Sequence, residues 1–347
     1  MKVAVALSGG VDSSVSAALL KQKGYEVIGV TMIVSSTSKA SSSVIDVQRI
    51  CKQLNIPHYT YNLINKFNTE IIDYFCSEYK NGRTPNPCPL CNKIIKFGEL
   101  FNYVKKEHKV DFFATGHYAR IKYNKELNKY QLLKGIDNKK DQSYMLYKLT
   151  QEQLKYTLFP LGNQTKEITK KIAMNLNLPI IHKKESQDVC FIEGNLKKFL
   201  NQKIRVNPGE IINNKGEVLG YHKGIIHYTI GQRKGLGISY LYPLYVTDII
   251  PETNKIIVGH KSEVLGKNLI ANDFNVVSIG NLPKELTQVQ AKIRYNSPLS
   301  DAIIETIDNG KVLIKFKEFQ EAITPGQSVV VYKDDILIGG GIIQKKI

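Results

Sequence analysis

The most specific chemical pattern in the chain lies near its amino terminus, where residues 8–14 read SGGVDSS. The two glycines let the backbone turn tightly and approach a ligand closely, and the serines place hydroxyl groups beside the start of a helix. The unpaired backbone N–H groups at a helix N-terminus favour an anion. An apolar run, residues 3–7, precedes the turn, and a helix-like stretch, residues 13–23, follows it. The pattern predicts a loop that binds the polyphosphate of ATP.

The spacing of this loop excludes two familiar phosphate-binding fingerprints, because it is neither G-x-x-x-x-G-K-[ST] nor G-x-G-x-x-G. It is similar instead to the pyrophosphate loop of the N-type ATP pyrophosphatases, which cleave ATP between the α- and β-phosphates to adenylate a carbonyl oxygen. An ordinary Gly-Ser turn is the alternative. The expected strand before the loop and the helix after it argue against that alternative.

Three of the five cysteines lie in segments that could do chemistry. Cys88 and Cys91 form a C-x-x-C pair within RTPNPCPLCNK, residues 83–93, and Cys190 lies in KKESQDVCFI, residues 183–192. A C-x-x-C pair alone is compatible with redox chemistry, with half a zinc site or with neither. A single cysteine before Phe-Ile is more often a packing residue.

Prolines and lysines determine what we expect of Cys91. Three prolines between positions 85 and 89 predict an extended loop, with a helix beginning only near Asn92. Cys91 would then lie at or just before a helix N-terminus, close to Lys93 and Lys96. The helix dipole and the two ammonium groups would lower the pKa of its thiol below about 8.5 and favour the thiolate.

The pattern of apolar residues predicts an α/β fold. From residue 1 to about residue 204, strands alternate with helical patterns, as in a doubly wound parallel sheet. Ligands of such sheets bind beyond the carboxyl ends of the strands, so the turns after the expected strands should converge on an adenosine pocket. Short alternating strands follow, which predict a small β-rich central domain, residues 205–265, and a C-terminal β-barrel, residues 266–347.

The composition indicates a folded, basic protein. Its 347 residues include 48 Lys and Arg against 31 Asp and Glu, for a net charge of +17, which predicts a polyanionic partner. A solvated basic surface is the alternative. The sequence shows no signal peptide and no apolar run of the ~18 residues that a membrane helix needs, and its odd number of cysteines argues against a disulfide framework, so we expect a cytoplasmic protein.

The chain resembles the bacterial tRNA-specific 2-thiouridylases, the MnmA family, over nearly all of its length. The resemblance rests on SGGVDSS, RTPNPCPLCN, ATGHYAR, KDQSYMLY, SQDVCFI, TIGQRKGLG and TPGQS, which occur in the family's order. It implies ATP-dependent 2-thiolation of the wobble uridine of tRNA. AMP is first transferred to the C2 oxygen with release of pyrophosphate, and sulfur then displaces AMP. ATP, Mg²⁺ and tRNA are thus implied, on a sheet of the N-type ATP pyrophosphatase (adenine nucleotide α-hydrolase-like) kind.

The resemblance also implies roles for particular residues. The cysteine matching Cys190 receives sulfur as a persulfide from a donor such as a relay protein, and the one matching Cys91 is the nucleophile that frees sulfide or closes a disulfide with it. The implied ATP contacts are Ala6, Leu7, Ser8, Gly9, Gly10, Val11, Asp12, Ser13, Met32 and Gly116. The implied tRNA contacts are Asn86, Pro87 and Cys88 at the flipped base, with His117, Lys140, Asp141, Gln142, Arg294, Tyr295 and Gln327.

One residue departs from the family pattern, because many members carry Asp where this chain has Cys88. Cys88, Cys91 and Cys190 could instead hold three irons of a [4Fe–4S] cluster and leave the fourth iron open to sulfide. Zinc fits less well, since a structural zinc site takes four protein ligands and no fourth is apparent. The third thiol favours the cluster over the persulfide route.

Two other functions are compatible with parts of the pattern. Another adenylating synthetase of the same loop class, acting on a small carboxylate, would need neither a basic surface nor paired cysteines. A tRNA-binding or iron–sulfur module with a vestigial ATP site would need no turnover of ATP. Release of pyrophosphate stimulated by tRNA separates the three interpretations.

Overall fold

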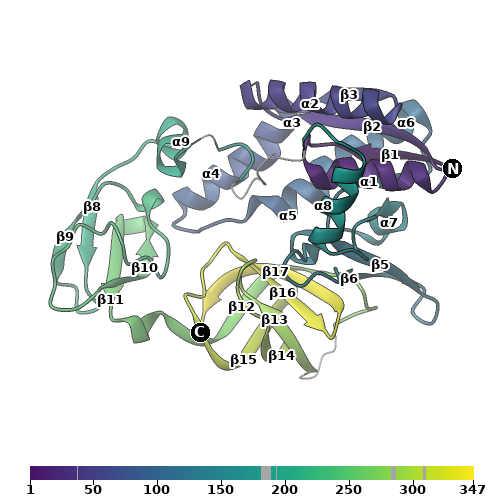
Figure 1. Ribbon diagram of the computed structural model, residues 1–347. Helices are drawn as coiled ribbons and strands as arrows, with labels where there is room; N and C mark the ends of the chain where they lie inside the picture. Colours follow the sequence, from purple (N-terminus) through teal and green to yellow (C-terminus); the bar gives the residue numbers. More distant parts are fainter. Residues whose placement is uncertain (37, 181–188, 193, 283–286, 308–309) are drawn as a thin grey trace.

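The computed structural model has three parts that follow one another along the chain (Figure 1). They are a parallel sheet with helices, a small β-rich unit and a β-barrel. The predicted α/β fold class is therefore confirmed, while the boundaries after residues 204 and 265 stay predictions. The structure describes residues 1–36, 38–180, 189–192, 194–282, 287–307 and 310–347.

The first sheet is parallel throughout and has the order β3-β2-β1-β4-β7. The interior strand β1 is almost entirely apolar, which is typical of a strand covered on both faces. The strands are β1 (Lys2–Ala6), β2 (Glu26–Ile33), β3 (His58–Asn62), β4 (Phe112–Ala114) and β7 (Thr157–Leu158).

Alternate side chains of β1 enter two different helical layers. Val3 and Val5 share a core with Ala17 of α1 and Val47 of α2, whereas Ala4 belongs to the core on the other face. The sheet is thus doubly wound, as predicted. None of the helices in the described ranges is both long and apolar enough to cross a membrane. The helices of this part are α1 (Val11–Gln22), α2 (Ser38–Leu54), α3 (Ile64–Phe67), η1 (Asn68–Ile72), α4 (Asp73–Lys80), α5 (Pro87–Cys91), η2 (Asn92–Leu100), α6 (Phe101–His108), η3 (Ser143–Leu146), α7 (Gln151–Lys155), α8 (Lys166–Asn175) and α9 (Leu196–Lys203).

The second and third parts are built from β-strands. The central sheet has the order β10-β11-β8-β9, and the barrel runs β12-β15-β14-β13-β16-β17 and closes by pairing β12 with β17. The central strands are β8 (Gly209–Ile212), β9 (Val218–His222), β10 (Tyr245–Ile250) and β11 (Lys255–Gly259), with the short helices η4 (Ile225–His227), η5 (Pro251–Thr253) and η6 (Lys261–Val264). The barrel strands are β12 (Leu265–Val276), β13 (Thr287–Lys292), β14 (Ser300–Ile307), β15 (Lys311–Glu321), β16 (Ser328–Lys333) and β17 (Ile336–Lys346).

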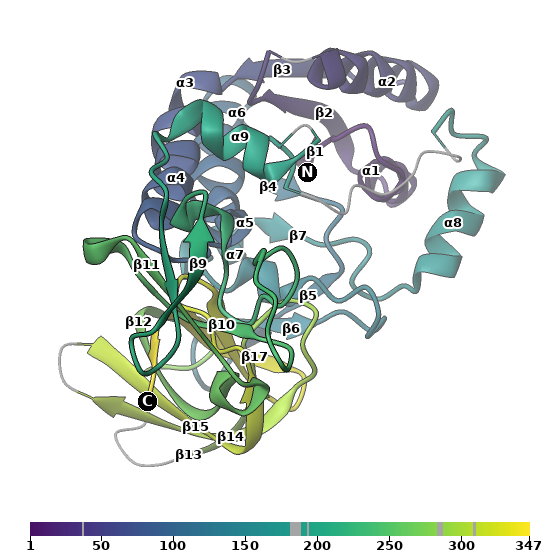
Figure 2. The ribbon, with the colours of Figure 1, turned by 90° about the vertical axis from the view of Figure 1, so that its left-hand side faces the viewer.

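A hairpin from the first part extends the sheet of the barrel. It consists of β5 (Ala119–Asn124) and β6 (Lys129–Lys134), and β6 pairs antiparallel with β17. Figures 1 and 2 show the hairpin beside the barrel strands. The Arg120 guanidinium also contacts the Asp335 carboxylate of the barrel at 2.8 Å. The first and third parts are therefore joined by backbone hydrogen bonds as well as by side chains.

Candidate active site

The SGGVDSS loop folds around the N-terminus of α1. Gly9 has a φ of 71°, a left-handed conformation that favours glycine, and Gly10 occupies the N-cap position. The Ser8 backbone N–H donates to the Ser13 Oγ at 3.3 Å, and the Ser13 hydroxyl donates to the Gly10 carbonyl at 3.1 Å. Because glycine has no side chain to cap the helix, its first N–H groups face an incoming anion. The local geometry is that of a preformed phosphate site.

The other predicted ATP contacts lie at the same edge of the sheet. Val30 of β2 pairs with Ala6, the last residue of β1, and Met32 lies two residues further along β2. Gly116 follows β4 and lies directly against the loop, since a Cβ atom there would be 2.7 Å from the Ser13 nitrogen. The structure therefore brings the loop, Met32 and Gly116 to one edge.

A lysine that sequence reasoning missed reaches this loop. The Lys166 ammonium, at the start of α8, lies 2.7 and 2.8 Å from the two carboxylate oxygens of Asp12. The Tyr118 hydroxyl donates to the same carboxylate at 2.9 Å. One signal in the sequence could have found Lys166. A lysine directly after a threonine N-cap opposes the helix dipole, and such local conflicts are typical of functional sites.

The helix that carries the cysteines begins earlier than predicted. Asn86 is its N-cap and accepts a hydrogen bond from the Cys88 N–H at 3.3 Å, and helical backbone then continues through α5, η2 and α6. The expectation of an extended loop up to Asn92 is wrong. Pro87 and Pro89 occupy the first turn, where the missing N–H breaks no helical hydrogen bond. Cys91 consequently lies inside the helix rather than at its N-terminus.

The predicted lowering of the Cys91 pKa is also wrong. Burial raises the pKa of the Cys91 thiol to about 12 and that of Cys88 to about 11. The Lys96 ammonium lowers both, but by less than burial raises them. Nearby Cys190 raises both pKa values further, so the three thiols share one site. Cys88 and Cys91 are half-buried, whereas Cys190 is exposed.

The three thiols are close together but are not arranged as metal ligands. Within the described residues, no group of three or more His, Cys, Asp or Glu side chains is placed so that it could hold a metal ion. Residues 186–188 of the SQDVCFI segment lie outside the described residues. The geometry therefore does not provide the ligand set that the cluster hypothesis requires.

His117 links the ATP edge to the cysteine helix. It directly follows Gly116, and its ring centroid lies 6.1 Å from that of Phe97, which belongs to η2. Its Nδ1 is 2.7 Å from the Thr115 hydroxyl oxygen. Burial lowers the pKa of His117 well below its usual value, and the Lys96 charge lowers it further. A neutral imidazole thus lies beside η2, which directly follows Cys91 in the chain, and next to the glycine that packs on the phosphate loop.

The predicted tRNA contacts come from segments that interlock. The Gln327 amide donates to the Thr84 carbonyl at 2.8 Å, and the Tyr295 hydroxyl donates to the Asp141 carbonyl at 3.1 Å. Gln142 accepts from the Tyr118 N–H at 3.1 Å. A cavity of about 130 Å³ opens between these segments, with Asn86, Leu90, Tyr147, Lys148, Gly326 and Ser328 among its lining residues.

Two further predicted contacts, Asp141 and Arg294, also have side chains that form hydrogen bonds within the protein. The Asp141 carboxylate accepts from the Gly135 N–H at 3.0 Å and from the Ser143 hydroxyl at 2.9 Å, while burial raises its pKa. The Arg294 guanidinium donates to the Glu321 carbonyl at 2.8 Å. Lys140, on the same loop as Asp141, is only partly buried. The side chains of Asp141 and Arg294 therefore stabilise the folded segments around them.

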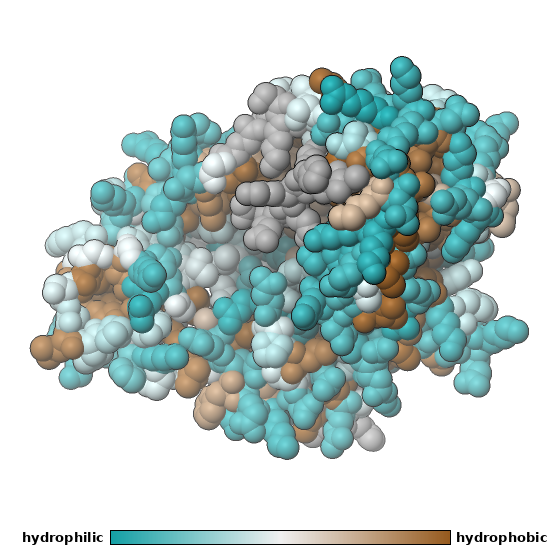
Figure 3. Space-filling view, viewed as in Figure 1, coloured by the Kyte–Doolittle hydropathy of each residue, from teal (hydrophilic) through white to brown (hydrophobic). Residues whose placement is uncertain are grey.

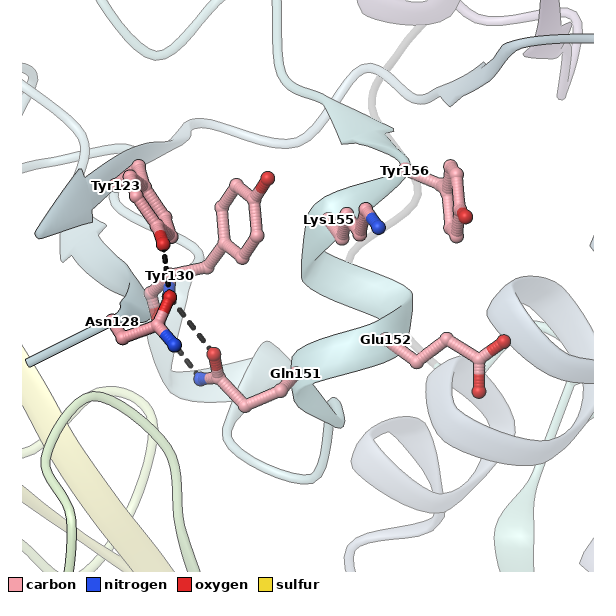
Figure 4. A pocket seen from close by; sticks show the side chains of 7 residues that line it. All are labelled: Tyr123, Asn128, Tyr130, Gln151, Glu152, Lys155 and Tyr156. Carbon is pink, nitrogen blue, oxygen red and sulfur yellow. Dashed lines mark hydrogen bonds between the residues drawn. The ribbon is translucent and has the colours of Figure 1, made fainter. Parts of the chain in front are cut away.

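A larger surface pocket lies away from the predicted residues. It measures about 490 Å³ and lies between the β5–β6 hairpin and α7. Figure 4 shows the Gln151 side chain pointing towards the hairpin, where its amide oxygen accepts from the Tyr130 N–H at 2.8 Å. None of the predicted ATP, tRNA or cysteine residues lines it. Its lining residues are Tyr123, Asn128, Tyr130, Gln151, Glu152, Lys155 and Tyr156.

The surface agrees with the composition. Hydrophilic side chains cover most of the face seen in Figure 3, including the region of α8. With a net charge of +17, such a surface suits a polyanion larger than ATP.

Comparison with protein families gives matches along the whole chain. Residues 1–194 match the model described as tRNA methyl transferase HUP domain. Residues 197–260 match the tRNA methyl transferase PRC-barrel domain, and residues 267–343 match the Aminomethyltransferase beta-barrel domain. The three matches follow the three parts of the fold.

Individual relatives are similar over their full lengths. The tRNA-specific 2-thiouridylase MnmA 1 of Caldanaerobacter subterraneus subsp. tengcongensis is 51% identical, over 100% of this chain and 98% of the relative. The tRNA-specific 2-thiouridylase MnmA of Carboxydothermus hydrogenoformans is 46% identical over the same shares, and that of Clostridium perfringens is 45% identical over 99% and 98%. Among solved structures, the U34-tRNA thiolase NcsA from Methanococcus maripaludis with its [4Fe-4S] cluster matches 58% of this chain and 64% of its own, with 20% identity and a TM-score of 0.37.

Proposed function

We propose how this chain works from the premise that it belongs to the family of tRNA-specific 2-thiouridylases. The relatives described above are 45% to 51% identical to it over nearly their full lengths. The chain is accordingly a tRNA sulfurtransferase that uses ATP to thiolate a tRNA uridine. One observation supports this active site most strongly, which is the position of His117. This residue follows Gly116, the glycine that packs on the phosphate loop, and its ring contacts Phe97 on the cysteine helix.

The first half-reaction uses the phosphate loop. The C2 oxygen of uridine attacks the α-phosphorus of ATP, and the bond from that phosphorus to the bridging oxygen of the β-phosphate breaks. The N–H groups at the start of α1 and the Ser8 and Ser13 hydroxyls favour the departing pyrophosphate. Carboxylate and hydroxyl oxygens are ligands that suit Mg²⁺, so Asp12 and the loop serines would hold it. Mg²⁺ there would neutralise charge on the leaving group.

The second half-reaction uses the thiols, and their exposure supports different roles. Cys190 is exposed, so a persulfide donor can reach it, whereas Cys91 is half-buried. The Cys91 thiolate attacks the inner sulfur of a Cys190 persulfide, which forms a disulfide and releases hydrosulfide. Hydrosulfide adds at C2 and AMP leaves with the former C2 oxygen. A thiol reductant then restores both cysteines.

The flipped uridine would bind beside Asn86, Pro87 and Cys88. These residues form the first turn of α5, and the cavity of about 130 Å³ borders Asn86. We assign the tRNA to the surface formed by this turn, the loop around Lys140 and the barrel residues Arg294, Tyr295 and Gln327. Since tRNA is its substrate, we place the enzyme in the cytoplasm.

The test of this function follows both products. ATP should be converted to AMP and pyrophosphate in a reaction that tRNA stimulates, and mass spectrometry of digested tRNA should detect 2-thiouridine when a persulfide donor is present. Pyrophosphate release that ignores tRNA but responds to a small carboxylate would indicate the synthetase alternative. Tight tRNA binding without any turnover of ATP would indicate the binding module, and ADP as the main product would contradict the loop assignment.

Cys88 separates the persulfide route from a [4Fe–4S] route. The persulfide route needs only Cys91 and Cys190, so Cys88→Asp should keep its activity with a persulfide donor, and the anaerobically purified protein should contain no iron. About four irons per chain, absorption near ~400 nm and their loss in Cys88→Asp would instead establish the cluster. The described geometry supports the first outcome.

A further inference from the structure

Three sequence motifs, one from each part of the chain, meet at Thr84. This residue belongs to RTPNPCPLCN, while Thr229 belongs to TIGQRKGLG and residues 325–327 belong to TPGQS. The Thr84 hydroxyl donates to the Thr229 hydroxyl of the central unit at 3.0 Å. The Thr84 backbone N–H donates to the Pro325 carbonyl of the barrel at 2.9 Å, and its carbonyl accepts from the Gln327 amide at 2.8 Å. The three polar groups of Thr84 therefore all bond to the other two parts.

Close backbone packing accompanies these hydrogen bonds. Gly326 has a φ of 91°, and a Cβ atom there would lie 3.0 Å from the N, C and O atoms of Thr84. A Cβ atom at Gly82, which also has a positive φ, would lie 2.8 Å from the Ile249 side chain of the central unit. Residues 82–84 are thus in direct contact with both the barrel and the central unit.

The chain between α4 and α5 has few hydrogen-bonding groups of its own to hold it. Two of residues 84–87 are prolines, which carry no N–H group. Only Thr84 and Asn86 can therefore donate from the backbone here. The Thr84 N–H bonds to the barrel, and Asn86 is the N-cap of α5. The path by which the chain enters α5 consequently depends on contacts from the other parts, and Thr84 makes three of them.

We propose that Thr84 is a positioning residue for the uridine. It does not touch the base but acts through the turn of residues 86–88, which it holds in the productive orientation when the central unit and the barrel are both in place. The inference rests on the proposed function, which puts the uridine at this turn, and it gives Thr229 a role in the reaction. A displaced uridine would slow the adenylation step, because its C2 oxygen has to reach the α-phosphorus of ATP.

The test removes one hydroxyl and follows the first half-reaction alone. Thr84→Val keeps both backbone hydrogen bonds of the residue and loses only the bond to Thr229. With saturating Mg-ATP and saturating tRNA, the single-turnover rate of pyrophosphate release should fall about tenfold, less than the hundredfold that a 1 Å misplacement causes. The Kd values for tRNA and ATP should stay unchanged, since neither ligand is bound by the hydroxyl. Thr84→Ser keeps the hydroxyl and should restore most of the rate.

A double-mutant cycle shows whether the rate depends on this particular bond. Thr229→Val removes the other partner and should give a similar loss, and the double valine variant should lose no more than either single variant. Thr247→Val is the matched control, because it removes a hydroxyl bond to the Ile257 carbonyl, 3.2 Å long, inside the central unit. That variant should release pyrophosphate at the natural rate.

The contrary results are distinct. An unchanged rate in Thr84→Val, additive losses in the double variant, or weaker tRNA binding with a normal rate at saturation would overturn the proposal and leave Thr84 with a structural role only. A lower Tm without a change in rate would do the same. If Thr84→Val does not fold, Thr229→Val carries the test from the central unit. Failure of the natural protein to release pyrophosphate with tRNA would instead contradict the proposed function.

Discussion

The phosphate loop and the cysteine helix differ in what determines their chemistry. The loop depends on its own residues, because Gly9, Gly10 and Ser13 form it through backbone conformation and short-range hydrogen bonds. The pKa of Cys91 depends on the burial of its thiol in the folded protein, which outweighs the charge of Lys96 on its own helix. Local sequence is therefore a good guide to a binding loop and a poor guide to the pKa of a thiol.

The largest expected effect is a loss of thiolation in a cysteine variant that still forms AMP and pyrophosphate. Cys91→Ser should reduce thiolation to background, because a serine hydroxyl does not replace a thiolate as nucleophile towards a persulfide. Formation of AMP and pyrophosphate should persist, since the loop does not depend on the thiol. Cys190→Ser should behave alike. Nucleoside mass spectrometry and pyrophosphate release measure the two halves, and loss of both in Cys91→Ser would show that the regions are coupled.

The activity of the phosphate loop should depend on how closely Gly116 packs against it. A Cβ at Gly116 would lie 2.7 Å from the Ser13 nitrogen, so Gly116→Ala has to shift the loop. We expect kcat/KM for ATP to fall by up to about a hundredfold, as misplacements near 1 Å can cause. Gly280→Ala is the control, because a Cβ there meets nothing within 4 Å. Equal kinetics in both variants would contradict the packing of Gly116 on the loop.

The pH dependence of Cys91 tests the dominance of burial. With a pKa near 12, its thiolate fraction should rise about tenfold per pH unit between pH 8 and pH 10, and alkylation by iodoacetamide should rise with it. An unperturbed thiol would level off above about pH 9.

Lysine substitutions sharpen the same measurement. Lys96→Met removes a charge that lowers the Cys91 pKa, so alkylation should slow by a few-fold, whereas Lys93→Met should leave it unchanged. Peptide mass spectrometry locates the modified cysteine. A plateau near neutral pH would restore the original expectation of a thiolate.

The smallest effect concerns the tRNA surface. Binding affinity should fall with salt on a log–log scale, and Lys140→Ala should reduce the slope by about 0.7 if Lys140 contacts one phosphate of the anticodon loop. Lys139→Ala removes the same charge from the adjacent residue and should leave the slope as it is. Equal slopes for both variants and the natural protein would place the phosphate contacts elsewhere.

These contrasts explain which expectations held. The succession of strand and helix patterns up to about residue 204 is a local pattern, and it predicted the doubly wound sheet. The structure confirms that sheet by placing Val3 and Val5 in one helical core and Ala4 in the other. The prediction of an extended loop before Asn92 failed because proline disrupts the interior of a helix, whereas Pro87 and Pro89 lie in the first turn of α5.

Other features were beyond local patterns. The contact between Lys166 and Asp12 joins residues far apart in the chain, and its only local trace is a cation at the wrong end of a helix. The predicted ATP, tRNA and cysteine contacts stay predictions, although the structure brings the ATP contacts to one edge of the sheet and the three thiols near one another.

The pairing of β6 with β17 means that the first part of the chain cannot be separated from the barrel, although the two parts lie far apart in the sequence. A fragment that ended before the barrel would expose the β6 edge together with Leu132, which is fully buried in the whole chain. Unpaired apolar edges invite association with other chains, so such a fragment would aggregate rather than retain ATP chemistry. Recombination between relatives would therefore succeed only where the hairpin and the barrel come from the same parent.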